Sequence, residues 1–226
     1  MRLVLVRHGV SVANLKGLVT GTPRDDLSPA GVEQVGQTRI FLERIDFQAQ
    51  HFFTSQWLRA QHSARILFPG AAFQVDPRLG ETHAGSVADI RLPEFLIQQP
   101  DFYANHLNRY PDGETHAELN QRVLAWLRDI QEQCADTVVA VTHAGPIACL
   151  LQHALGIPME RFPSLIACNA SLSVVDYASV GDAGQLVLFS QLPESSARTL
   201  TGRQIGRSLA AVMMTKPSRG SGSKPW

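Results

Sequence analysis

The sequence predicts an α/β fold, a three-layer sandwich with a mostly parallel central sheet and a short cap insertion. Two observations carry this prediction. Short apolar runs alternate with helical patterns along the chain. Two of the runs, residues 3–6 and 137–141, are continuously apolar or β-branched, which is typical of strands that are buried on both faces.

The first half of the chain is expected to alternate strand and helix. Ser28 is a good N-cap and Pro29 suits a first helical turn, so a helix begins there. Pro69 and Gly70 end the next helix. The expected elements are a strand over 3–6, a helix over 28–45, a strand over 51–54, a helix over 57–68 and a strand over 73–75.

The second half starts with the insertion. Residues 84–113 are irregular and contain three prolines, which favours a cap of short helices. Its aromatic residues are expected to serve packing more than recognition. After the cap we expect an amphipathic helix over 115–133, a strand over 137–141, a helix over 144–155, and strands over 172–175 and 186–189.

Composition excludes several classes of protein. Hydrophobic residues make up 44% and charged residues 18%, which is ordinary globular composition. The 20 basic and 20 acidic residues cancel, so a nucleic-acid binder is not expected. No apolar stretch is long enough to span a bilayer. The three cysteines are too few for a disulfide framework, so we expect a cytoplasmic protein with buried thiols.

A boundary is expected near residue 194. Residues 1–194 would form one domain, and residues 195–226 a basic, Gly/Ser/Pro-rich tail with six basic residues and no acid. Within the tail, residues 200–214 can form a short helix with an apolar face. The tail is interpreted as a solvated appendage or a docking segment, and the sequence assigns it no partner.

Ionisable residues gather where predicted strands end. Arg7 and His8 follow the first strand, and His143 follows the strand over 137–141. Ligands of open α/β sheets bind beyond the carboxyl ends of strands, so neighbouring strands would bring the two imidazoles into one pocket. Arg59 lies in the first turn of a helix, and Glu81 follows the third strand.

These residue types suit phosphoryl transfer. Two Arg side chains and helix N-termini attract an anion and stabilise charge on phosphoryl oxygens. A neutral His is a competent nucleophile, and a carboxylic acid can protonate the leaving alkoxide. Arginine would supply the positive charge, so no metal or other cofactor is expected.

The ordered motifs resemble those of the histidine phosphatase (phosphoglycerate mutase-like) superfamily. They cover about residues 2–192. They are Arg7-His8-Gly9, Asn14, Gly21 with the helix entry at 27–34, Ser55 to Ala64, Leu79-Gly80-Glu81, Pro111-Asp112-Gly113-Glu114-Thr115, and Thr142-His143-Ala144-Gly145.

The resemblance implies a role for each matched position. His8 would be the nucleophile, and Glu81 the general acid and then the base. The phosphoryl group would be bound by Arg7, Arg59 and His143. Substrate contacts are implied for Asn14, Thr20, Gly21 and the backbone N–H of Ala144.

The chain departs from the family pattern at two places. Val10-Ser11 replaces the usual Glu-Thr or Glu-Ser pair, and residues 85–89 lack the Trp of a "G-x-W-E" element. The cap is also shorter than in true phosphoglycerate mutases. A short cap favours hydrolysis over intramolecular transfer.

The sequence is compatible with four functions. The resemblance favours a phosphomonoesterase that acts on a small phosphorylated metabolite. The alternatives are a mutase, a protein phosphohistidine phosphatase and, with least support, a non-catalytic binding module. The expected partner is a small phosphate ester, and a homodimer is an open alternative.

Overall fold

The structure, a computed structural model, describes residues 1–193. Its centre is one six-stranded sheet with the order β3-β2-β4-β1-β5-β6. β1 to β4 run parallel, whereas β5 pairs antiparallel with both β1 and β6. The strands are β1 (Arg2–Arg7), β2 (His51–Thr54), β3 (Gln74–Val75), β4 (Thr137–Thr142), β5 (Leu172–Asp176) and β6 (Gln185–Gln191).

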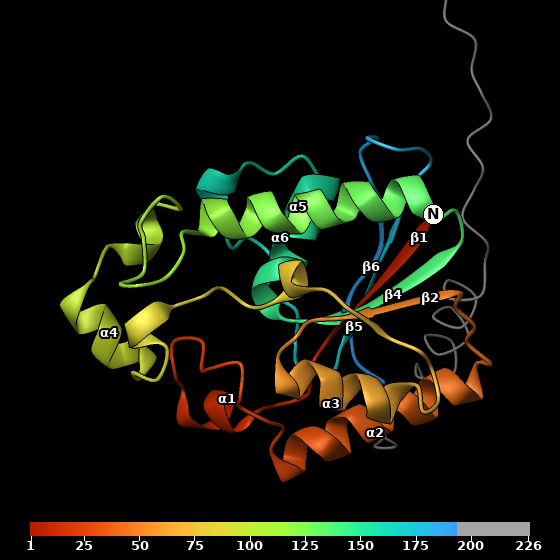
Figure 1. Cartoon of the computed structure of the whole chain (residues 1–226), viewed down its shortest axis with the longest axis horizontal. Helices are drawn as coiled ribbons and strands as arrows, with labels where there is room; N and C mark the ends of the chain where they lie inside the picture. The colour runs from red at the N-terminus through yellow and green to blue at the C-terminus, as the bar shows by residue number, and fades with distance from the viewer. Residues whose placement is uncertain (194–226) are drawn as a thin grey trace, which may run out of the picture.

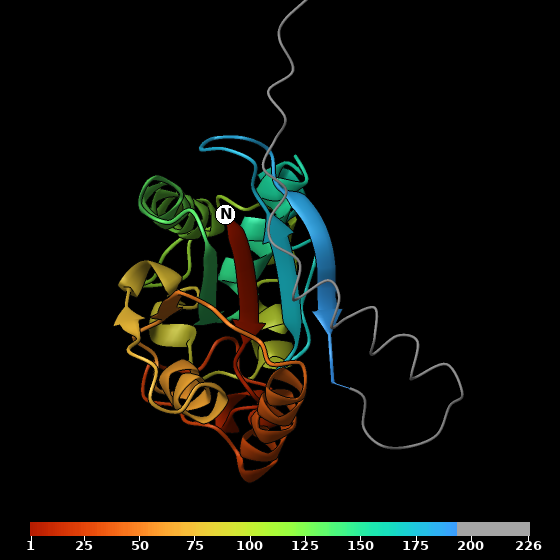
Figure 2. The same ribbon diagram turned by 90° about the vertical axis from the view of Figure 1, so that its right-hand side faces the viewer.

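Helices cover both faces of this sheet, which confirms the three-layer prediction. Figure 1 shows α5 (His116–Gln133) and α6 (Ala144–Ala154) on one side, and α2 (Pro29–Arg44) and α3 (Leu58–Leu67) on the other. The twist of the sheet between these layers is visible in Figure 2. The Ser28 hydroxyl accepts a hydrogen bond from Gly31 N, so the predicted N-cap of α2 is confirmed.

Successive side chains of the central strands point to opposite faces of the sheet and fill one hydrophobic core on each face. Leu3 and Leu5 of β1 pack with the α5 and α6 side, whereas Val4 and Val6 pack with the α2 and α3 side. β4 repeats the pattern, and all four of these β1 side chains are fully buried. A strand buried on both faces needs an apolar residue at every position, which is why the period-two signal is absent from the sequence.

The register of β1 against β4 brings the two predicted strand ends together. Arg7 is paired with Thr142, so His8 and His143 leave adjacent strands at the same level. The N-terminal end of β5 reaches the same edge, because its Leu172 is paired with Val6 in an antiparallel ladder. Three chain segments therefore meet at one edge of the sheet.

The cap has a small core of its own. Phe95, Phe102 and Tyr110 are buried against one another, which confirms that these aromatic residues pack. α4 (Leu92–Gln98) and two 3₁₀ turns, η2 (Gly85–Val87) and η3 (Phe102–Ala104), form the insertion, displaced from the sheet in Figure 1. Two further 3₁₀ turns are η1 (Pro77–Leu79) and η4 (Met159–Arg161).

One helix was missed and one expectation was wrong. α1 (Val12–Lys16) was not predicted; a capping box between Ser11 and Asn14 starts it, and Gly17 ends it in a left-handed conformation. Cys168 is exposed, although burial was expected, because it lies in the loop before β5. The predicted tail and its short helix lie outside the described residues. In the described part of the chain, no helix is both long and apolar enough to cross a membrane.

Candidate active site

His8 lies immediately beyond β1, and its side chain is buried at the centre of the site. Its Nδ1 is 2.7 Å from the carbonyl oxygen of Gly9, which can only accept a hydrogen bond. Nδ1 must therefore carry the proton, and Nε2 carries the lone pair. Arg59 Nε donates to that Nε2 at 3.1 Å, which fits the same tautomer. His8 is thus oriented as a neutral imidazole with a nucleophilic Nε2.

Arg59 is buried in the first turn of α3. Its guanidinium stacks on the Trp57 ring, with the central carbon 4.4 Å from the ring centroid. Its Nη2 donates to the carbonyl of Thr20 at 2.9 Å, and Nη1 donates to that of Thr22 at 3.3 Å. One side chain therefore fixes both the loop over 20–22 and the orientation of His8.

His143 ends β4 and is fully buried beside His8, with 4.9 Å between the ring centroids. Its Nε2 is 2.7 Å from Ser55 Oγ. Ser55 Oγ already accepts from Trp57 N, so its hydroxyl hydrogen is available to His143 Nε2. Nδ1 then carries the proton of His143 and has no hydrogen-bond partner among residues 1–193. A buried donor of this kind suits an anionic oxygen.

Glu81 reaches the N-terminus of α6, next to His143. Its Oε1 accepts from Gly145 N at 3.2 Å and from Thr82 N at 2.9 Å. A Cβ atom on residue 145 would lie 2.3 Å from that oxygen, so only glycine allows this approach. A free N–H of the helix end, that of Gly145, and the N–H of Thr82 hold the carboxyl group at the site.

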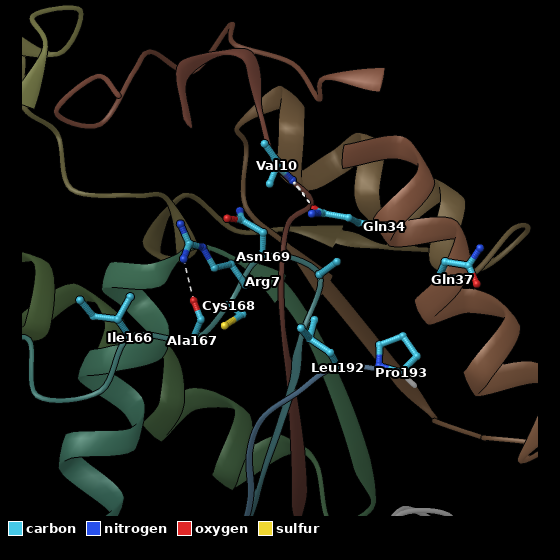
Figure 3. A pocket seen from close by; sticks show the side chains of 11 residues that line it. Arg7, Val10, Gln34, Gln37, Ile166, Ala167, Cys168, Asn169, Leu192 and Pro193 are labelled. Atoms are coloured by element: carbon cyan, nitrogen blue, oxygen red, sulfur yellow. Dashed lines mark hydrogen bonds between the residues drawn. The ribbon is translucent and has the colours of Figure 1, made fainter. Parts of the chain in front are cut away.

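Arg7 forms another side of the site. Its Nη1 donates to the carbonyl of Ala167 at 2.6 Å, and its buried Nε has no hydrogen-bond partner among the described residues. Figure 3 shows that Arg7 also borders a groove of about 560 Å³ between α2 and the loop before β5. The other residues that line this groove are uncharged: Val10, Gln34, Gln37, Ile166, Ala167, Cys168, Asn169, Ala170, Leu192 and Pro193.

The remaining predicted contacts lie around this centre. Thr20 and Gly21 belong to the loop held by Arg59; Gly21 has a φ of 69°, and its added Cβ would lie 2.5 Å from that of Ala13. The Ser11 N–H donates to Asn14 Oδ1 at 3.1 Å as part of the capping box of α1. Asn14 therefore has a structural contact besides the substrate contact that the resemblance implies. Ala144 is the first residue of α6.

Asn169 and Ser55 contact the site and were given no role from the sequence, although Ser55 begins one of the matched motifs. Asn169 Nδ2 donates to the carbonyl of His8 at 3.0 Å and to Asn14 Oδ1 at 3.3 Å. Ser55 orients His143, as described above. An antiparallel β5 could have indicated Asn169, since the residues before such a strand lie at the carboxyl ends of its parallel neighbours.

Burial and neighbouring cations keep both imidazoles neutral. Burial and then the charges of Arg59 and Arg7 hold the pKa of His8 well below 6.5. Burial and then Arg59 do the same to the pKa of His143. Burial lowers the pKa of Arg59 to about 10, so its guanidinium stays charged at neutral pH. The site therefore pairs neutral imidazoles with a cation, as phosphate binding and nucleophilic attack require.

The buried histidines predict how stability depends on pH. Burial also lowers the pKa of His116 to about 4. Between pH 6.5 and 5 these histidines become protonated in the unfolded chain but stay neutral in the folded protein. The free energy of unfolding should therefore fall as the pH falls. Each such histidine contributes up to about 1.4 kcal/mol per pH unit. Urea unfolding at pH 7, 6 and 5 measures this slope.

The control for this prediction is His116→Gln, which removes one of these groups. Its slope should be smaller than that of the wild type by up to about 1.4 kcal/mol per pH unit. If the wild-type free energy of unfolding stays constant or rises as the pH falls from 6.5 to 5, the pKa values of the buried histidines are not lowered by folding.

The sequence is similar to those of known phosphoryl-transfer proteins. The sequence model of the histidine phosphatase superfamily (branch 1) matches residues 3–189. A protein of Yersinia enterocolitica named "Probable phosphoglycerate mutase GpmB" is 32% identical over 187 residues, which are 78% of this chain and 85% of that protein.

Two solved structures are similar in fold. The mycobacterial glucosyl-3-phosphoglycerate phosphatase in complex with VO3 has a TM-score of 0.74 and 25% identity, covering 84% of this chain and 98% of that one. The alpha-ribazole phosphatase from Shigella flexneri also has a TM-score of 0.74, with 23% identity, covering 88% of this chain and 100% of that one.

Proposed function

The chain belongs to the histidine phosphatase superfamily, and from this we propose that it is a metal-independent phosphatase that hydrolyses a small phosphorylated metabolite through a phosphohistidine on His8. The observation that carries the proposal is the state of His8. It is a neutral imidazole whose Nε2 lone pair meets the Arg59 guanidinium, beside Arg7 and a second buried imidazole.

The first step forms the phosphoenzyme. His8 Nε2 attacks phosphorus, a P–N bond forms and the P–O bond to the alcohol breaks. The Glu81 carboxyl gives its proton to the departing alkoxide, so the alcohol leaves neutral. The carbonyl of Gly9 accepts from Nδ1–H and supports the positive charge that develops on the ring.

The second step returns the enzyme to its starting state. The Glu81 carboxylate takes a proton from water, the water oxygen attacks phosphorus, and the P–N bond to His8 breaks. Inorganic phosphate leaves, and Glu81 is again protonated. One residue serves as acid and then as base, which microscopic reversibility requires when both steps use the same face.

The phosphoryl oxygens would be bound by Arg7, Arg59 and His143. The unpartnered Arg7 Nε and His143 Nδ1 support this assignment, because both are buried donors at the site. We also assign substrate contacts to Asn14, Thr20, Gly21 and Ala144, the last through its backbone N–H at the start of α6. Among residues 1–193, no group of three or more His, Cys, Asp or Glu side chains is placed to hold a metal ion.

Mutase activity is the second candidate, because the relative at 32% identity is named a phosphoglycerate mutase. Hydrolysis is favoured here because the insertion over 84–113 is short: it has a small aromatic core of its own and binds the loop over 17–21 through its backbone. A mutase has to shield phosphohistidine from water until the phosphoryl group is returned, and a small cap offers less cover. The name of the similar mycobacterial structure also supports a phosphatase.

Phosphate release from a panel of phosphate esters, in the presence of a chelator, tests the proposal. The panel contains phosphoglycerates, sugar phosphates, ribazole phosphate and an aryl phosphate. We expect release from at least one small metabolite, undiminished by the chelator. Isomerisation of a phosphoglycerate without net phosphate release would instead establish the mutase, and loss of activity on chelation would contradict the metal-independent mechanism.

A further inference from the structure

Arg122 of α5 binds the backbone of the segment that carries Glu81. Its Nη1 donates to the carbonyls of Arg78 at 2.7 Å and Gly80 at 2.9 Å, and its Nη2 donates to that of Glu81 at 3.0 Å. These carbonyls lie where the chain leaves η1, beyond the regular hydrogen bonding of the sheet. A side chain from another element therefore holds the backbone of the predicted general acid.

The other two donors of Arg122 go to Glu114. Nε donates to Glu114 Oε2 at 3.0 Å, and Nη2 donates to Oε1 at 2.6 Å. The guanidinium has five N–H donors in a rigid fork, and the five hydrogen bonds use each of them. Both side chains are mostly buried, with 23% of Arg122 and 16% of Glu114 exposed. Lysine, with a single ammonium group, cannot reproduce this arrangement.

Glu114 connects the same pair to the base of the cap. Its Oε1 accepts from His83 N at 2.8 Å, and its own N–H donates to the carbonyl of His83 at 2.9 Å. Residue 83 is where the chain enters the cap, and residue 114 is where it returns. A residue of β4 binds the remaining carbonyl, since Thr142 Oγ1 donates to that of Leu79 at 2.6 Å. All four consecutive carbonyls over 78–81 are thus bound by side chains.

We propose that Arg122 and Glu114 are positioning residues that align the Glu81 carboxyl for proton transfer and tie that alignment to the base of the cap. This inference rests on the proposed function, because it assigns Glu81 a proton to deliver. The Glu81 carboxyl is held by two backbone N–H groups, that of Gly145 at 3.2 Å and that of Thr82 at 2.9 Å, so a shift of the backbone over 78–81 changes its position relative to α6. Proton transfer is sensitive to such displacements.

The test compares leaving groups. An aryl phosphate releases a stable phenolate and depends little on proton donation, whereas an alkyl phosphate depends on it strongly. We expect Arg122→Lys to lower kcat for an alkyl phosphate by about tenfold or more, and for an aryl phosphate by less than about threefold. Glu114→Gln keeps the size of the side chain and removes its charge, so we expect a smaller loss with the same selectivity.

A double-mutant comparison separates positioning from general damage. In a Glu81→Gln background no acid remains to align, so Arg122→Lys should add no further selective loss. The matched control is Arg109→Lys, since Arg109 also binds a carboxylate of α5, Glu118, and a carbonyl, that of Gly113, but at the surface. It should leave the alkyl-to-aryl ratio unchanged.

Equal losses for both esters, or a selective loss that persists in the Glu81→Gln background, would overturn the positioning role. Wild-type turnover is measured first, because this distinguishes a failure of the proposed phosphatase function from a failure of the positioning role. A wild type that releases phosphate from no ester would remove the proposed function itself. An active wild type with unselective Arg122 variants would remove only the positioning role.

Discussion

Replacing His8 by alanine should abolish phosphate release, with kcat lower by about 10⁴-fold or more. The reason is that, in the proposed mechanism, Nε2 is the atom that bonds to phosphorus, and alanine offers no nucleophile in its place. Binding of phosphate should suffer much less, because the two arginines proposed to bind the phosphoryl group, Arg7 and Arg59, remain. The measurement is steady-state hydrolysis of the best ester from the panel, together with the affinity for inorganic phosphate.

The control is the fold of the variant. His8 is packed against His143 and Arg59, so its removal leaves a small cavity and a modest loss of stability. Circular dichroism and urea unfolding should show a folded protein. A folded His8→Ala protein that retains a substantial share of wild-type turnover would rule out His8 as the nucleophile.

Replacing Glu81 by glutamine should produce the second-largest effect, and it should depend on the leaving group. Glutamine keeps the size and the acceptor for Gly145 N but has no proton to give. For alkyl phosphates we expect kcat to fall by about 10²–10⁴-fold, since the alkoxide must then leave unprotonated. For an aryl phosphate the first step should be much less affected. Burst kinetics with the aryl ester separate the two steps.

The second half-reaction gives a further check on Glu81. In the proposed mechanism its carboxylate also activates water, so the glutamine variant should accumulate phosphoenzyme from the aryl ester. Losses of equal size for alkyl and aryl esters, without accumulation, would contradict the assigned role. Glu43→Gln is a matched control, because it makes the same change at a surface carboxylate that pairs with Arg39, and it should leave turnover of both esters unchanged.

Much of the fold could be predicted from local sequence. The runs over 3–6 and 137–141 predicted the two central strands, because strands buried on both faces need continuous apolar residues. Ser28 and Pro29 predicted the start of α2, which the N-cap confirms. The arrangement of β1 beside β4 depends on long-range pairing, and no local signal gives the strand order.

The site residues at strand ends could be predicted from the sequence, whereas the residues that support them through backbone contacts could not. Arg7, His8 and His143 stand at strand ends, and the rule for open α/β sheets predicted a shared pocket on the condition that their strands are neighbours, which the pairing of β1 with β4 meets. Asn169 and Arg122 act through hydrogen bonds to the carbonyls of distant residues. Such contacts leave no pattern in the sequence, because any residue presents the same carbonyl group.

Direct detection of the phosphoenzyme tests whether His8 carries the phosphoryl group during turnover. The enzyme is mixed with an ester labelled in its phosphoryl group and quenched in alkali within milliseconds, and the labelled peptide is identified. We predict one acid-labile, alkali-stable phosphoryl group per active site, on His8, which disappears as inorganic phosphate is released. Turnover without any phosphoenzyme, or a label that persists on another residue when His8 is replaced, would contradict the account.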